Sequence, residues 1–203
     1  MGTVPIPSPS IVVRIQRLQA FTIAWMSFEA ASSLWAAWQA RSPALLAFGG
    51  DSAIELLSAT VVLWRFRNHA SEHAERSAAR IAGGLLILLA VYVVLASGLS
   101  LIGYLEPKPS YLGIAVLAAA ALIMPWLARE KRRLSAETGS AALRADAAES
   151  TLCAYLSIIA LAGLTLHAVW SFRWADPLAA LAITPFVLYE ARETLRGKPC
   201  GCC

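Results

Sequence analysis

Acidic side chains interrupt several long apolar stretches of this sequence, at Glu29, Asp51, Glu55, Asp146 and Glu149. Asp51 and Glu55 are four residues apart, a spacing that puts both carboxylates on one face of a helix, about one turn apart. Glu149 and Cys153 have the same spacing. Two oxygen ligands on one helix, with an oxygen and a sulfur on another, predict a four-coordinate site for a divalent cation.

A structural role for the same groups is the competing interpretation. A carboxylate inside a bilayer is costly. In this interpretation it is kept simply because it bridges to a polar group on a neighbouring helix, without binding any ion. Glu29 has no second acidic residue at helical spacing, so its role stays open. It is a candidate packing partner, proton relay or metal ligand. Asp146 is a candidate proton relay or accessory group. Cys153 alone would be a small core residue, and its assignment as a ligand depends on its spacing from Glu149.

Six apolar stretches of membrane-spanning length position these groups. The 203 residues are 58% hydrophobic and only 15% charged, whereas about a quarter of the residues of a soluble domain are charged. A soluble globular enzyme, a disordered chain and a disulfide scaffold are therefore excluded. A bilayer core needs roughly 20 apolar residues of helix. We predict an all-α membrane protein with six transmembrane helices, at residues 18–40, 44–66, 81–105, 111–128, 145–170 and 174–189.

Lysine and arginine set the orientation of these helices. They crowd the N-terminal segment, the connections 65–80 and 129–144, and the C-terminal tail, whereas the other connections carry only Arg41, Lys108 and Arg173. Basic residues near helix ends stay on the cytoplasmic side. We therefore expect both termini in the cytoplasm and the chain in the plasma (inner) membrane. The net charge of +4 follows from this topology, so it calls for no nucleic-acid partner.

The two predicted ligand pairs occupy matching positions in the two halves of the chain. When residues 42–55 are aligned with residues 140–153, Asp51 meets Glu149 and Glu55 meets Cys153. Three helices in each half predict two inverted three-helix halves, a plan that places a transport site at the interface of the repeats. Small residues would let the second and fifth helices approach closely; they are Gly49, Gly50, Ala147 and Ala148.

Three segments follow from these spans. Residues 1–16 are expected to be a cytoplasmic N-terminal tail, residues 17–190 the six-helix transmembrane domain, and residues 191–203 a short cysteine-rich cytoplasmic tail. In the tail, Cys200, Cys202 and Cys203 face a reducing compartment where thiols persist, which favours transient capture of a soft cation. Incidental cysteines and lipidation are the alternatives.

A second metal-like motif lies in the connection between the second and third helices. His69 and His73 flank Glu72 in the His-x-x-Glu-His pattern of some zinc peptidases. In a connection crowded with arginine, a solvated helical extension is the favoured interpretation. Weak metal collection by the two histidines comes next, and catalysis comes last.

The motifs together resemble one known family. The stretch from Asp146 to Cys153, followed by Gly163 and then by Trp174-Ala-Asp-Pro177, resembles the fifth and sixth helices of the cation diffusion facilitator family. Gly50-Asp-Ser-Ala-Ile-Glu55 resembles its second helix. In that family an acidic pair on the second helix and a His and Asp pair on the fifth bind Zn²⁺ or a similar ion.

Carried over by position, Asp51 and Glu55 form the first pair, and Glu149 and Cys153 stand where the His and Asp usually are. Oxygen donors suit Mn²⁺ or Fe²⁺, while a thiolate leans toward Zn²⁺, Cd²⁺ or Co²⁺. The resemblance implies a homodimer, and with only residues 191–203 in place of the usual cytoplasmic domain we expect it to form through the membrane part. It implies metal and proton as partners, and no organic cofactor.

The resemblance also implies a function. The expected protein is not an enzyme but an exporter of a Zn²⁺-like divalent cation in exchange for protons, with its site between the second and fifth helices. Binding to carboxylate and thiolate expels protons, so a proton gradient can drive the ion. The main alternative is a membrane thiol/disulfide redox protein that uses Cys200 and Cys203, and a third is an intramembrane peptidase that uses His69 and His73.

Overall fold

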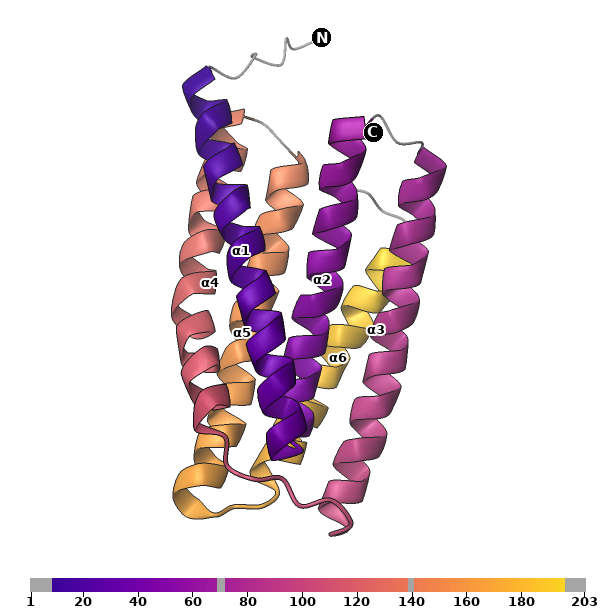
Figure 1. The fold of residues 1–203 in the computed structure, drawn as a ribbon, viewed down its shortest axis with the longest axis vertical. Coiled ribbons are helices and arrows are strands. Elements are labelled where there is room, and N and C mark those ends of the chain that lie inside the picture. Colours follow the sequence, from indigo (N-terminus) through magenta and orange to yellow (C-terminus); the bar gives the residue numbers. More distant parts are fainter. Residues whose placement is uncertain (1–8, 69–71, 139–140, 196–203) are drawn as a thin grey trace.

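Six α-helices and no strand make up the part of the chain that the computed structural model describes, residues 9–68, 72–138 and 141–195. Each predicted apolar stretch corresponds to one helix, and successive helices run in opposite directions (Figure 1). The helices are α1 (Pro9–Ala40), α2 (Pro43–Asn68), α3 (Glu72–Leu101), α4 (Tyr111–Thr138), α5 (Ala141–Trp170) and α6 (Ala175–Leu195).

Three stretches of the described residues are by themselves long and apolar enough to cross a bilayer: Gly83–Leu101, Tyr111–Thr138 and Asp146–Trp170. They belong to α3, α4 and α5. The apolar character of the other helices is interrupted by ionisable groups, among them Glu29 in α1, Asp51 in α2 and Glu190 in α6. Candidate functional groups lie on both kinds of helix, because α5 carries Glu149 and Cys153.

The turns after α1 and α5 are short, whereas the connection after α3 covers residues 102–110, because α3 ends at Leu101 and not at residue 105 as predicted. The residue that follows α1, Arg41, has a φ of 52°, and Ser171 after α5 has a φ of 53°. Gly103 after α3 has a φ of 86°. A residue in the left-handed conformation just past a helix lets the following amide donate a hydrogen bond to one of the last carbonyl oxygens of the helix. The amide of Ser42 donates in this way to Ala37 O at 3.2 Å.

Serine caps start the helices that follow two of these turns. The hydroxyl of Ser42 accepts a hydrogen bond from the amide of Leu45 at 3.1 Å, and that of Ser110 accepts one from Gly113 at 3.1 Å. Each side chain satisfies an amide that has no partner within its own helix. The caps fix where α2 and α4 enter the bundle, and so fix the depth of the groups that follow.

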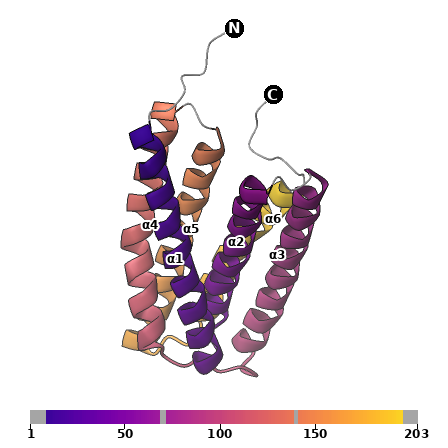
Figure 2. The ribbon, with the colours of Figure 1, turned by 45° about the horizontal axis from the view of Figure 1, so that its top comes forward.

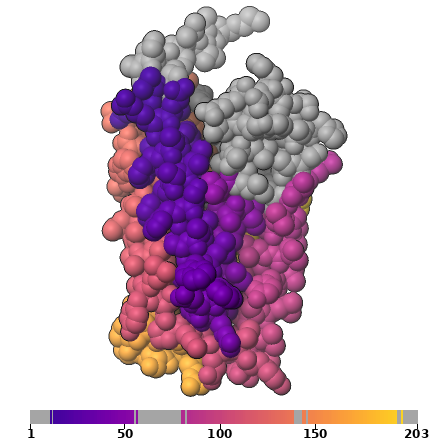
Figure 3. Space-filling model, viewed as in Figure 1, coloured from indigo at the N-terminus to yellow at the C-terminus, as the bar shows by residue number. Residues whose placement is uncertain are grey.

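The helices form two groups of three that are joined by contacts of α2 with α1 and α5 and of α5 with α6. Figures 1 and 2 show α1, α4 and α5 on one side and α2, α3 and α6 on the other, while α2 also packs against α1 and α5. The face in Figure 3 is made mainly by α1, with α4 to its left and α3 to its right. The bundle encloses an apolar core; large members of it include Leu45, Phe48, Leu117, Met124, Leu127 and Ile183.

Corresponding helices of the two halves of the chain contact one another, while the inverted repeat itself stays a prediction. The contacts pair α1 with α4, α2 with α5 and α3 with α6, and each pair joins corresponding helices of the two halves. Within the halves, α1 packs on α2 as α4 packs on α5. A two-fold axis that relates oppositely oriented halves would produce this pattern.

The predicted role of the glycines in joining α2 to α5 is wrong. A Cβ at Gly49 would lie 2.8 Å from Ser33 Cβ, and one at Gly50 would lie 2.8 Å from the side chain of Leu89. These glycines therefore admit α1 and α3. The close approach involving α5 is to α6, because a Cβ at Gly163 would lie 2.4 Å from Ala179 Cβ.

Charged residues extend α4 and α5 beyond the apolar stretches. The connection expected at 129–144 is helical except at residues 139–140, which lie outside the described ones. Arginine, lysine and glutamate are good helix formers, so their charge ends an apolar stretch without ending a helix. Leu134 and Lys131 are buried in this extension, and their packing stabilises it. Likewise, α6 continues to Leu195 rather than ending near residue 189.

Candidate metal site

Asp51 lies deep in the bundle with only 1% of its surface exposed. None of the described residues offers a hydroxyl, amide or ammonium donor to either of its oxygens. The group that meets it is another carboxyl, that of Glu190 on α6. Two carboxylates repel one another at this range, so the arrangement requires a shared proton or a cation between them.

Further acidic groups gather around Asp51. Glu29 of α1 and Glu149 of α5 both lie close enough to interact with its charge. Glu149 also interacts with Glu190. Four helices thus direct carboxyl groups toward one region, and such convergence is what a cation requires of a site inside a bilayer.

Glu29 is fully buried and is satisfied by three donors. Its Oε2 accepts a hydrogen bond from Trp25 Nε1 at 2.7 Å. Its Oε1 accepts one from Ser52 Oγ at 2.9 Å and one from Cys153 Sγ at 3.4 Å. Glu29 therefore ties α1 to α2 and α5, which gives it the packing role that the sequence left open.

The predicted ligands are only partly brought together. The structure places Asp51 within range of the charge of Glu149, and it places Cys153, which is 1% exposed, beside Glu29. No three described His, Cys, Asp or Glu side chains are grouped closely enough to hold one ion. The side chain of Glu55 is not among those described.

The candidate cytoplasmic ligands fall mostly outside the described residues. His69, Cys200, Cys202 and Cys203 lie there, whereas His73 belongs to the first turn of α3 without a described side chain. Metal capture by these residues therefore stays a prediction.

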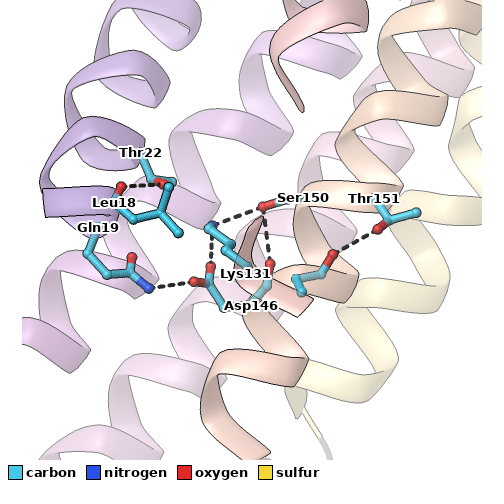
Figure 4. Close-up of polar contacts among 8 residues, drawn as sticks. Leu18, Gln19, Thr22, Lys131, Asp146, Ser150 and Thr151 are labelled. Carbon is cyan, nitrogen blue, oxygen red and sulfur yellow. Dashed lines mark hydrogen bonds and ion pairs between the residues drawn. The ribbon is translucent and has the colours of Figure 1, made fainter. Parts of the chain in front are cut away.

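Asp146 belongs to a different polar group from Asp51. Its Oδ1 accepts a hydrogen bond from Lys131 Nζ at 2.7 Å, and its Oδ2 accepts one from Gln19 Nε2 at 2.6 Å (Figure 4). Lys131 also donates to Ser150 Oγ at 2.9 Å. This group joins α1, α4 and α5 near the ends of the helices where the basic connections lie.

Sequence reasoning missed two residues of this region. Glu190 directly follows the sixth apolar stretch, and Lys131 was counted with the basic residues of a connection. An acid at the very end of an apolar stretch was the available signal for Glu190. For Lys131 the signal was a helical register that places it on the face of buried Leu127 and Leu134.

A third buried carboxylate has a structural role. Asp176, at the start of α6, accepts a hydrogen bond from Ser42 Oγ at 2.5 Å. Ser42 also caps α2, so this contact ties the beginnings of α2 and α6 together. It lies at the end of the bundle with the short turns, away from Asp146 and Lys131.

Comparison with known proteins identifies the family of this chain. The model of the cation efflux transmembrane domain matches residues 20–197, which is most of the chain. The search of curated proteins found no match. Members of the matching family transport divalent metal cations and are not enzymes. Because the match covers most of its length, the chain belongs to the family defined by the cation efflux transmembrane domain.

Proposed function

We propose that this transporter exports Zn²⁺ or a chemically similar divalent ion in exchange for protons, through a site between α2 and α5. Asp51, Glu55, Glu149 and Cys153 are the proposed ligands, and Glu190 is the group across from Asp51. The observation that carries the proposal is the buried Asp51 carboxylate, which faces the carboxyl group of Glu190 and receives no hydroxyl, amide or ammonium donor from the described residues.

The same observation supports proton coupling. Two carboxyl groups that face one another inside the bundle need a positive charge between them, either a proton or the metal ion. When the ion leaves, a proton must replace it, and when the ion returns, the proton must go. Competition between the metal ion and the proton for one pocket therefore couples metal transport to proton transport, and no other coupling mechanism is needed.

The donor set leads us to propose Zn²⁺ first. Three carboxylates with one thiolate offer both hard and soft donors, and Zn²⁺ accepts oxygen and sulfur alike. Mn²⁺ and Fe²⁺ would use the oxygens and gain little from Cys153. Cd²⁺ would favour the sulfur.

The proposed setting is the plasma (inner) membrane, with six spans and both termini in the cytoplasm. The start of α1 and the end of α6 lie at the same end of the bundle (Figure 1). The basic residues Arg14, Arg17 and Arg132 are exposed near that end, as expected for a cytoplasmic face. We further propose a homodimer that forms through the membrane part.

The thiol/disulfide alternative gains no support from Cys153. Its thiol is buried and donates to Glu29, whereas a redox thiol needs access to a partner. For Cys200, Cys202 and Cys203 we propose transient capture of the ion before it enters the site. The family assignment also disfavours a peptidase.

Reconstituted vesicles test the proposed exchange. With Zn²⁺ added outside and a pH dye inside, we expect Zn²⁺ uptake together with a rise in luminal pH, because each entering ion expels protons. Protein-free vesicles are the control. Uptake with no change in luminal pH would contradict proton exchange. Absence of uptake of Zn²⁺, Cd²⁺, Co²⁺, Mn²⁺ and Fe²⁺ would contradict the proposed function itself.

A further inference from the structure

Lys131 is a buried cation on the cytoplasmic half of α4. Its side chain is 1% exposed, and a buried ammonium costs several kcal/mol unless it is paired and hydrogen-bonded. Both conditions are met, because Nζ donates to Asp146 Oδ1 at 2.7 Å and to Ser150 Oγ at 2.9 Å. An ammonium has three donors, so these two contacts leave one direction open to another acceptor.

Asp146 is held from both sides. Gln19 of α1 donates to its second oxygen at 2.6 Å, while Lys131 holds the first (Figure 4). The ion pair thus joins α1, α4 and α5 at one point. Asp146 keeps 28% of its side chain exposed, so the carboxylate is reachable from outside even though its cation is not.

A small cavity lies beside this pair. It has a volume of about 30 Å³, which is room for about one water molecule, and Gln19, Lys131, Asp146 and Glu149 are among the residues that line it. Glu149 interacts with the charge of Lys131 and also with that of Asp51. Glu149 is therefore the proposed ligand that both the ammonium and Asp51 influence.

We propose that Lys131, held by Asp146, is a tethered cation that competes with the transported ion for the charge of Glu149, and so sets the affinity of the site on its cytoplasmic side. The inference rests on the proposed function, because it assumes that Glu149 is a ligand. A fixed ammonium repels an arriving divalent ion, and inside a protein this repulsion is much stronger than in water. The ion binds when it replaces the ammonium as the positive charge that stabilises Glu149, and the ammonium regains that interaction when the ion departs.

Opposite charge changes at this pair should shift affinity in opposite directions. Lys131→Gln keeps hydrogen-bonding capacity but removes the competing charge, so the KM for Zn²⁺ should fall about tenfold, equivalent to about 1.4 kcal/mol. Its kcat should fall as well, because the ion then leaves more slowly. Asp146→Asn removes the preferred partner of the ammonium, which then turns to Glu149, and the KM should rise.

A purely structural role predicts a different pattern. Both substitutions would then lower thermal stability and the amount of folded protein, with the same KM for the molecules that fold. Lys131→Arg keeps the charge and should restore the KM of the unsubstituted protein. If Lys131→Gln does not fold, the double variant Lys131→Gln/Asp146→Asn replaces it, with a KM expected about tenfold below that of Asp146→Asn.

The decisive experiment measures KM and kcat for Zn²⁺ uptake into vesicles for these variants, normalised to folded protein. Opposite shifts of KM support the competition. A KM that is unchanged or raised in Lys131→Gln, or in the double variant relative to Asp146→Asn, overturns it. Failure of the proposed function is distinct, since the unsubstituted protein would then show no uptake.

Discussion

Asp51→Asn is expected to lower Zn²⁺ uptake into vesicles by at least about a hundredfold, because even groups that only orient a metal ligand are worth 10- to 100-fold. The amide is nearly isosteric with the carboxylate, so the buried position should still be filled. It is neutral, however, and it cannot exchange a proton for an ion. The measurement is the initial rate of Zn²⁺ uptake at matched amounts of folded protein.

Asp176→Asn is the matched control for this prediction. Asp176 is 2% exposed and Asp51 is 1% exposed, so both substitutions remove a buried carboxylate from the same bundle. Asp176 lies beside Ser42 at the start of α6, outside the proposed site, and its variant should keep uptake. Equal rates in Asp51→Asn and the unsubstituted protein would remove Asp51 from the site.

Glu29→Ala is expected to cost about 2 kcal/mol or more of stability, because a buried donor left without an acceptor costs about 1–3 kcal/mol. The substitution removes an acceptor from Trp25, Ser52 and Cys153, although Ser52 Oγ keeps the carbonyl of Phe48. It also opens a cavity where α1 meets α2 and α5. Thermal unfolding of the purified protein in detergent should show the loss as a lower Tm.

Glu29→Gln distinguishes a packing role of Glu29 from a role as a metal ligand. The amide keeps one oxygen acceptor, so the Tm should lie between those of Glu29→Ala and the unsubstituted protein, while Zn²⁺ uptake should persist. An unchanged Tm in Glu29→Ala together with lost Zn²⁺ binding would mean that Glu29 is a ligand and not a packing group.

The helices could be predicted because each apolar stretch is long and is bounded by polar or charged residues. Their ends could not, since the charged residues after Ala128 favour helix as strongly as the apolar residues before them. The positive φ at Arg41 and Ser171 has no signal in residue type either. In both cases tertiary packing decides where the helix stops.

Spacing along single helices led to the proposed ligands. The matching positions of Asp51 and Glu149 in the two halves pointed to these residues, and their charges interact in the structure, while their role as ligands stays a prediction. Glu190 and Lys131 could not be found in this way, because their roles depend on which helices become neighbours. The wrong assignment of Gly49 and Gly50 has the same origin: a small residue permits close approach without specifying the partner.

The central claim is that one pocket between α2 and α5 holds the transported ion. Crystals grown with Zn²⁺ and measured at the zinc absorption edge locate the ion directly by anomalous scattering. We expect a single strong intramembrane peak in each chain, about 2.0–2.2 Å from carboxylate oxygens of Asp51 and Glu149, the range of Zn–O bonds. An anomalous map with peaks only at His69, His73 or the cysteine tail, and none between α2 and α5, would contradict the account.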